Sequence, residues 1–194
     1  MFTVKGRKMF TMIKYDMIIG IDPDVEKSGV AYLKPSTRQL EVSSLEFPLL
    51  LEYLQHAKGI SEETNESLIV IVEASWLISH NWHKGKADNY RTAAAKGNSA
   101  GRNHEVGRKI VEMCRHYGIE VIEQRPLKKC WKGPGGKITH TELASFTGIM
   151  GKTNQEMRDA ALLAWNHAGL PIRIRDCRKK NSTDRLKNEE NIGT

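Results

Sequence analysis

Four acidic residues stand at positions where carboxylates could do chemistry. Asp22 follows an apolar run in IIGIDPDVEKSGVAYL (residues 18–33), and Glu73 closes the apolar run LIVIVE. Glu156 and Asp159 are three residues apart in NQEMRDAALLAW, and this spacing places both on one face of a helix. A carboxylate is costly to bury as an ion unless something compensates its charge, so these positions call for an explanation.

Binding of divalent cations is the chemistry that these carboxylates would share. If the strands that end at Asp22 and Glu73 are neighbours, both acids lie at the same edge of the sheet, and a helix packed across that edge adds the other two. Clustered carboxylates raise one another's pKa, and a hard cation such as Mg²⁺ relieves that repulsion. Two such ions can activate a water and stabilise the leaving oxygen of a phosphodiester. The acids therefore predict a nuclease site for two Mg²⁺ (or Mn²⁺) ions.

Three of the candidate residues also have plainer explanations. Asp22 precedes a proline and could be an ordinary turn residue. Glu156 completes the pattern Thr153-x-x-Glu156, which is typical of a capping box at the start of a helix. Trp76 carries a large ring that a hydrophobic core could absorb.

The pattern of apolar residues predicts one α/β domain that would position these acids. The predicted strands cover residues 18–22, 29–33, 39–47, 68–74 and 119–126. The predicted helices cover residues 48–59, about 98–117, 139–149 and 154–168, with Gly59 ending the first of them. Residues 60–67 are predicted to be a polar connector, and residues 75–97 to be irregular. Short links between the first three strands predict an antiparallel meander. The nearly continuous apolar run at 68–74 predicts a strand covered on both faces.

Composition adds broad limits. The chain has 194 residues and a net charge of +7, which suits one domain with a polyanionic partner. We expect an N-terminal arm at 1–16, a nuclease domain at 17–170 and a charged C-terminal tail at 171–194. Three scattered cysteines predict a reducing compartment rather than a disulfide framework. No window is apolar enough for a secretory signal or a membrane span, so we expect a cytoplasmic protein without a membrane partner.

Basic residues suggest where a nucleic acid would bind. The loop PLKKCWKGPGGK combines a Gly-rich turn with four lysines, which favours contact with phosphates: Lys128, Lys129, Lys132 and Lys137. Arg102, on the helix predicted at 98–117, could make the same contact or simply solvate the helix. Gly101 and Gly107 would let another element approach that helix closely, which makes it a candidate dimer surface.

Taken together, the motifs resemble those of RuvC-type Holliday junction resolvases, in the RNase H-like superfamily. IIGIDPDVEKSGVAYL resembles the opening hairpin of that family, IVIVEASW its second acidic strand, PLKKCWKGPGGK its lysine-bearing loop and NQEMRDAALLAW its final helix. The motifs occur in the family's order over residues 17–167. The sequence departs from the family at Asp24, where glycine is usual, and at Glu156, where Asp or His is commoner, which suggests a divergent branch, as in a phage or mobile element.

The resemblance implies an RNase H-like mixed β-sheet of five strands (β-β-β-α-β-α-β-α) flanked by helices. It implies that four residues are catalytic metal ligands: Asp22, Glu73, Glu156 and Asp159. It further implies a catalytic or phosphate-contacting lysine at 128, 129 or 137, with Lys137 a catalytic candidate, and stacking of Trp76 on a base. The implied activity is paired nicking of Holliday junctions (four-way DNA) by a homodimer. The alternatives are an RNA-processing or other branched-DNA nuclease of the same fold, and a non-catalytic nucleic-acid-junction binder.

Overall fold

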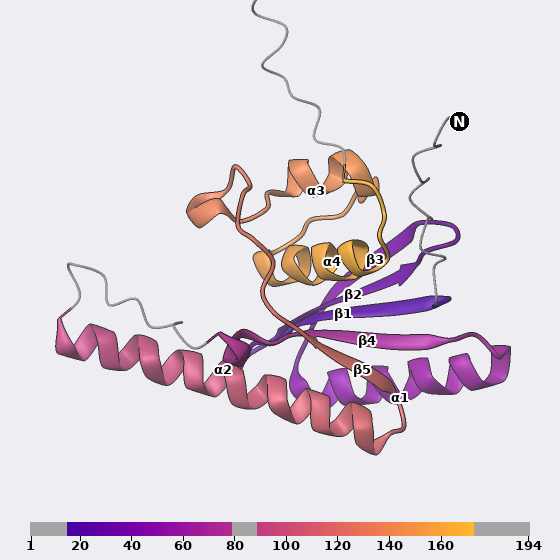
Figure 1. The fold of residues 1–194 in the computed structure, drawn as a ribbon, viewed down its shortest axis with the longest axis horizontal. Coiled ribbons are helices and arrows are strands. Elements are labelled where there is room, and N and C mark those ends of the chain that lie inside the picture. The colour runs from indigo at the N-terminus through magenta and orange to yellow at the C-terminus, as the bar shows by residue number, and fades with distance from the viewer. Residues whose placement is uncertain (1–14, 79–88, 173–194) are drawn as a thin grey trace, which may run out of the picture.

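A five-stranded mixed sheet forms the centre of the molecule (Figure 1). The computed structural model describes residues 15–78 and 89–172. The sheet has the order β3-β2-β1-β4-β5, with antiparallel pairing among β1, β2 and β3 and parallel pairing of β1 with β4 and of β4 with β5. The strands are β1 (Met17–Asp22), β2 (Ser28–Lys34), β3 (Gln39–Leu45), β4 (Leu68–Glu73) and β5 (Glu120–Gln124). The predicted meander and the predicted five-stranded α/β fold are confirmed.

Strands β1 and β4 lie side by side, which was the condition for bringing the first two acids together. Their parallel register pairs Ile18 with Ile69 and Ile21 with Val72. Asp22 and Glu73 are the last residues of these strands. Both acids are therefore carried to the same edge of the sheet.

Helices cover both faces of the sheet (Figure 1). One face carries α3 (His140–Thr147) and α4 (Gln155–His167), and the other carries α1 (Phe47–Thr64) and α2 (Tyr90–His116). Alternate residues of β4 enter the two resulting cores: Ile69 and Ile71 pack on the α4 side, and Val70 and Val72 on the α1 side. The strand is buried on both sides, as its unbroken apolar run predicted.

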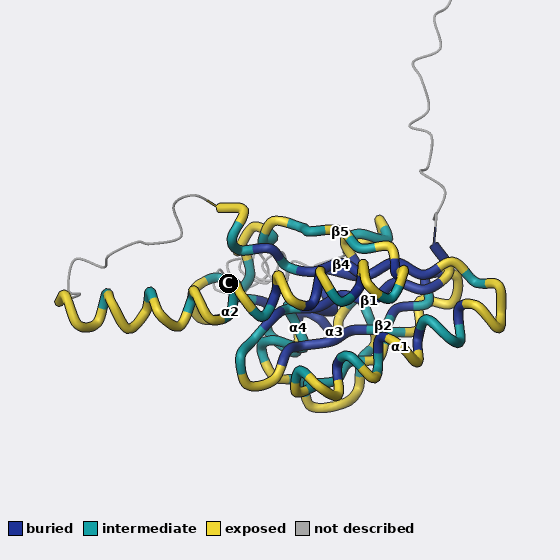
Figure 2. Tube along the Cα trace, turned by 90° about the horizontal axis from the view of Figure 1, so that it is seen from below, coloured by how far each residue is buried: buried dark blue, intermediate teal, exposed yellow. Residues whose placement is uncertain are grey.

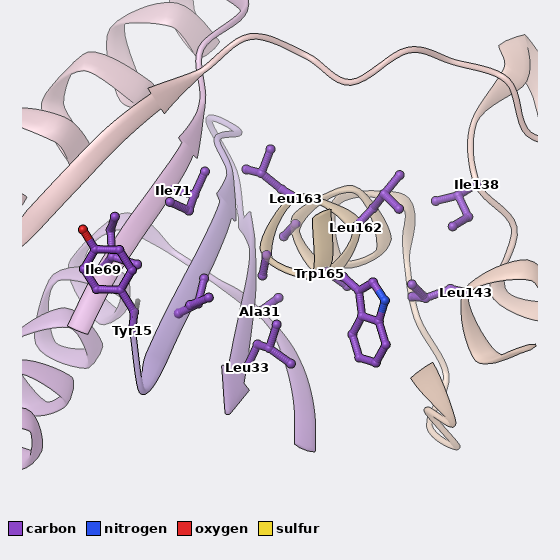
Figure 3. Packing of buried hydrophobic residues seen from close by; sticks show 14 residues of the cluster. Tyr15, Ala31, Leu33, Ile69, Ile71, Ile138, Leu143, Leu162, Leu163 and Trp165 are labelled. Carbon is purple, nitrogen blue, oxygen red and sulfur yellow. The ribbon is translucent and has the colours of Figure 1, made fainter. Parts of the chain in front are cut away.

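Helix α4 lies directly on the backbone of the two central strands (Figure 3). A Cβ atom at Gly20 would overlap the carbonyl oxygen of Ala160, and one at Gly29 would overlap the carbonyl of Glu156. Trp165, which is 1% exposed, fixes the far end of the helix in the core. These glycines bring the start of α4 to the edge of the sheet where β1 ends.

The first helix is longer than predicted. It continues through Gly59 to Thr64, and residues 60–64, predicted as a polar connector, form its last turn. Asn65, in the left-handed conformation with φ 55°, ends the helix. Ser61 is buried, and its hydroxyl donates a hydrogen bond to the carbonyl of Glu66 at 2.6 Å. Gly59 therefore does not end α1, contrary to the prediction.

The second long helix begins earlier than predicted. Residues 90–97, predicted to be irregular, form its first turns, and the Asn89 side chain caps them by accepting a hydrogen bond from the Thr92 N–H at 2.9 Å. Figure 2 shows that this part of α2 projects beyond the rest of the molecule and is largely exposed. At the start of the same segment, Ser75–Leu77 form one turn of 3₁₀ helix. Residues 79–88, which also belong to it, lie outside the described residues.

Two residues of the predicted N-terminal arm are attached to the domain. Tyr15 is buried in the core on the α4 side, and the Asp16 carboxylate accepts hydrogen bonds from the N–H and the hydroxyl of Ser67 at 2.9 and 2.7 Å. The rest of the arm and the tail beyond residue 172 lie outside the described residues. None of the helices in the described part of the chain is both long and apolar enough to cross a lipid bilayer.

Candidate active site

A cavity of about 190 Å³ lies at the edge of the sheet where β1 and β4 end. Four carboxylates contribute to its lining: Asp22 from β1, Glu73 from β4, and Glu156 and Asp159 from α4. The two strands meet there because they are parallel neighbours, and α4 reaches the same edge by packing on the glycines of the sheet. The structure thus brings together all four acids that the sequence singled out.

The acids are close enough to shift one another's titration. Burial raises the pKa of Asp22 well above its usual range, and the negative charges of Glu73, Asp159 and Glu156 raise it further, against the opposing effect of Lys137. Burial and the neighbouring Asp159 likewise raise the pKa of Glu73. The ionised acids therefore repel one another, and a bound cation would relieve that repulsion.

This repulsion predicts a pH-dependent effect of Asp22→Asn on stability. Folding raises the pKa of Asp22, so ionisation of this carboxylate lowers the free energy of unfolding. This loss is absent below the ordinary pKa near 3.8 and complete above the raised pKa. In the presence of a chelator, we expect the variant to gain stability relative to the wild type as the pH rises from about 4 to about 8. Urea denaturation of both proteins across this range measures the difference. A difference that does not change with pH would contradict the raised pKa.

A short chain of hydrogen bonds orients the Asp159 carboxylate. Its Oδ1 accepts from Gln155 Nε2 at 2.8 Å, and its Oδ2 lies 3.6 Å from the ammonium of Lys137. The Gln155 Oε1 in turn accepts from Arg158 at 2.9 Å, which fixes the amide with its NH₂ group toward Asp159. Both oxygens of Asp159 therefore face a donor.

Arg158 connects the two segments that supply Lys137 and Asp159. Its guanidinium donates to the carbonyl oxygen of Ile138 at 2.9 Å and to that of Thr153 at 2.7 Å. Sequence reasoning did not identify this residue, because nothing in its spacing distinguishes it from a solvated arginine. Gln155 could have been found, since a Gln and an Asp four residues apart are neighbours on a helix.

Glu156 does not cap its helix. The Asn154 side chain is the N-cap of α4 and accepts from the N–H of Met157 at 2.8 Å. A capping box of the expected kind forms instead at Thr139 and Glu142, at the start of α3. The explanation of Glu156 as a partner of Thr153 in a capping box is therefore wrong, and its carboxylate contributes to the lining of the cavity.

Lysines of the Gly-rich loop line the same cavity as the acids. Three of the four predicted lysines contribute to the lining: Lys128, Lys129 and Lys137. Lys132 is not among the lining residues, and its backbone N–H donates to Glu142 at 3.1 Å. The loop thus brings positive charge into the cavity that the carboxylates line, where a bound phosphate would meet both.

Trp76 is held by partners within the protein. Its Nε1 donates to Glu123 at 3.0 Å, and the guanidinium of Arg108 lies 5.8 Å from the centre of its ring. The ring also lies so close to Gly107 that a Cβ atom there would overlap it. These contacts agree with the explanation of Trp76 as a packing residue, and its stacking on a base stays a prediction.

Helix α2 contacts the segments that follow both acid-bearing strands. Asn103 Nδ2 donates to the Asp24 carboxylate at 3.0 Å, and Asn103 Oδ1 accepts from the N–H of Val25 at 3.2 Å. Gly107 abuts Trp76, which follows Glu73 by three residues. The Gly107 side of the helix is thus occupied within the chain, and only the Gly101 side of the predicted dimer surface has open space around it.

The donor set fits a hard divalent cation by its chemistry. Carboxylate oxygens are the ligands that Mg²⁺ and Mn²⁺ prefer, and Asp22, Glu73, Glu156 and Asp159 all contribute them to one cavity. Within residues 15–78 and 89–172, no three His, Cys, Asp or Glu side chains are grouped closely enough to hold an ion as they stand. The Asp159 carboxylate, whose two oxygens face Gln155 and Lys137, would have to turn toward the other acids to join a ligand set.

Comparisons with known proteins found no relative by sequence and a distant likeness to two solved structures. No protein-family model and no curated protein matches the chain. Among solved structures, it is similar to T. thermophilus RuvC in complex with Holliday junction substrate, at 15% identity and a TM-score of 0.48, over 78% of this chain and 92% of that one. It is also similar to a Thermus thermophilus RuvC structure, at 14% identity and a TM-score of 0.39, over 78% and 93% of the two chains.

Proposed function

We propose that this protein is a divalent-metal-dependent endonuclease that nicks four-way DNA junctions. One observation carries the proposal: four carboxylates from β1, β4 and α4 line one cavity together with lysines of a Gly-rich loop. Carboxylates alone would repel a nucleic acid, and lysines alone would bind one without cutting it. The combination suits a phosphodiester held between the two groups.

The choice of four-way DNA as the substrate depends on the sequence motifs. Four segments that carry these same residues resemble RuvC-type resolvases and occur in their order. We propose further that the protein acts as a homodimer, since two-fold symmetry would present two such cavities to opposing strands. Sedimentation equilibrium of the purified protein tests the dimer directly.

Each side chain of the cavity has a role in this proposal. Asp22, Glu73, Glu156 and Asp159 would hold two Mg²⁺ or Mn²⁺ ions, which when bound supply the Lewis-acid chemistry for attack of water on phosphorus. Lys137, already beside Asp159, would offset negative charge that develops on the phosphate. Lys128 and Lys129 would draw the DNA backbone toward the acids.

Cleavage of a synthetic four-way junction, with and without Mg²⁺, tests the function. We expect paired nicks that require the metal, made by the wild type but not by Asp159→Asn. A panel of flap DNA, RNA–DNA hybrid and structured RNA, assayed in parallel, identifies the preferred substrate. Cleavage of RNA alone would point to an RNA-processing enzyme, and tight junction binding without cleavage would point to a non-catalytic binder.

Gln155→Ala is expected to lower the rate of cleavage without preventing junction binding. The substitution removes the donor to Asp159 Oδ1, so this carboxylate loses its fixed orientation. Loss of a residue that orients a metal ligand costs about 10- to 100-fold in metal affinity or activity. Titration of the reaction with Mg²⁺ should show a higher metal requirement in the variant. Gln155→Glu, which cannot donate in its ionised form, should show a similar loss.

A further inference from the structure

Helix α2 contacts the segment that follows Asp22 at two points one helical turn apart. Asn103 bonds to the loop after β1, and four residues later Gly107 lies against the ring of Pro23, whose Cγ would be 3.2 Å from a Cβ atom at Gly107. The pairing of β1 with β4 ends at Ile21, one residue before Asp22. The contacts of α2 therefore begin where this part of the sheet ends.

The side chains of Asp24 and Asn103 form a closed set of hydrogen bonds, the Asp24–Asn103 clasp. Asn103 Nδ2 donates to Asp24 Oδ2 at 3.0 Å, and Asn103 Oδ1 accepts from the N–H of Val25 at 3.2 Å. The second oxygen of Asp24, Oδ1, accepts from the N–H of Glu26 at 2.9 Å. Every polar atom of the two side chains thus has a partner, and α2 is joined both to a side chain and to the backbone of the loop.

The clasp belongs to this chain rather than to the family that its motifs resemble. The sequence departs from the RuvC-type pattern at Asp24, where glycine is usual, and a glycine has no side chain with which to bond to α2. Both members of the clasp line the cavity that contains the four acids. They are 79 residues apart along the chain, so the contact forms only when α2 packs against the loop.

Arg102, which precedes Asn103, is not part of the clasp. It lines a second cavity, of about 540 Å³, which shares Asp24, Asn103 and Glu156 with the first. Its contact with phosphates stays a prediction, and the clasp does not depend on it.

We infer that Asn103 is a positioning residue, which through its clasp with Asp24 holds Asp22 where the four acids can share a cation. The inference rests on the proposed function, since it takes the first cavity as the site of cleavage. Asp24 is two residues from Asp22, and a displacement of about 1 Å in a catalytic group can cost about 100-fold in rate. A contact that fixes this short segment can therefore affect the reaction without touching the substrate.

Two single substitutions break the clasp without changing the size of a side chain. Asn103→Asp places two carboxylates opposite each other. Asp24→Asn, with its oxygen still bonded to Glu26, places an NH₂ group opposite that of Asn103. We expect each variant to cleave a saturating four-way junction about 10- to 100-fold more slowly than the wild type, the loss typical of a residue that orients a metal ligand. Junction binding, measured by fluorescence anisotropy, should persist in both.

The combined variant, Asp24→Asn with Asn103→Asp, restores the clasp in exchanged form. The amide at position 24 again donates to a carboxylate, whose other oxygen again accepts from the N–H of Val25. The net charge equals that of the wild type, so we expect the combined variant to cleave faster than either single variant. Asn98→Asp is the control for charge, because it makes the same substitution at an exposed position of α2 that lines neither cavity. It should cleave like the wild type.

Two measurements without DNA report on the clasp itself. The N–H of Val25 should exchange with deuterium faster in Asn103→Ala than in the wild type, because it loses its acceptor. Calorimetric titration with MnCl₂ should show weaker binding in both single variants and recovery in the combined variant. Unchanged exchange of Val25 would show that the clasp is not formed in solution and would overturn the inference.

The inference and the proposed function can fail separately. Wild-type rates in both single variants, or a combined variant no faster than the slower of them, would overturn the inference alone. Absence of cleavage by the wild type on every substrate would overturn the proposed function. In that case the MnCl₂ titrations still decide the inference: weakening and recovery would support the positioning of the acids by the clasp, and equal binding by all four proteins would overturn it.

Discussion

Asp22→Asn is expected to reduce junction cleavage by about 10²- to 10³-fold, the loss typical of removing one preorganised charge-stabilising group. Asp22 lies at the end of β1, between Glu73 of the neighbouring strand and the two acids of α4, and the pKa of Asp22 is raised by all three. Rates are measured with end-labelled junctions under single-turnover conditions.

Junction binding by the same variant should be as tight as that of the wild type or tighter, since a negative charge near the DNA is removed. Fluorescence anisotropy with labelled junctions measures it. Glu112→Gln is a suitable control, because it removes one exposed carboxylate of α2 that pairs with Lys109, away from the cavity. Normal cleavage by Asp22→Asn would show that the catalytic centre lies elsewhere.

Gly29→Ala is expected to have the largest effect on the fold and on cleavage together. A Cβ atom at this position would overlap the backbone carbonyl of Glu156, so α4 or β2 must move. Such overpacking usually costs about 1–3 kcal/mol, and the backbone that gives way here carries a proposed metal ligand. We expect a lower urea midpoint and a loss of cleavage that saturating Mg²⁺ does not restore.

Gly59→Ala provides the matched control for the loss of a glycine. Gly59 lies inside α1, and no atom lies within 4 Å of a Cβ added there. Alanine at such a helix position is favoured over glycine by roughly 0.5–1 kcal/mol, so this variant should be slightly more stable and fully active. A Gly29→Ala protein as stable as the wild type would show that α4 does not depend on this close approach.

The positions of the acids could be predicted because each stands at a break in a strong pattern. Asp22 and Glu73 end runs of apolar residues that can only be buried strands, and neighbouring parallel strands end at the same edge. Glu156 and Asp159 follow from helical spacing alone. The local sequence contains two Thr-x-x-Glu patterns, at Thr139 and at Thr153, and does not distinguish which of them forms a capping box. In the structure only the one at Thr139 does.

The errors in the helices have a common physical origin. Gly59 looked like a helix end, yet the packing of Ser61 and the left-handed Asn65 determine where α1 stops. The first turns of α2 have no buried face, so residues 90–97 lack the apolar periodicity by which a helix is recognised. Tertiary contacts, or their absence, decided these boundaries rather than local preference.

The roles of Arg158 and Asn103 could not be predicted for a different reason. Both are polar residues of ordinary spacing, and their partners are brought near by folding. Asn103, for example, bonds to Val25, which is 78 residues away along the chain. Such contacts exist only once the sheet and both of its helical layers are in place.

The packing of α4 against Gly20 and Gly29 affects when the candidate site can form during synthesis of the chain. The helix that supplies half of the proposed ligands is the last regular element in the described part of the sequence, and its partners β1 and β2 are the first. Long-range pairings of this kind form late, because a large loop must close before they can be made. Under the proposed function, the nascent polypeptide would thus not cleave DNA until almost all of the domain had emerged from the ribosome. A translation product truncated before residue 155 would lack α4 and with it two of the four proposed metal ligands.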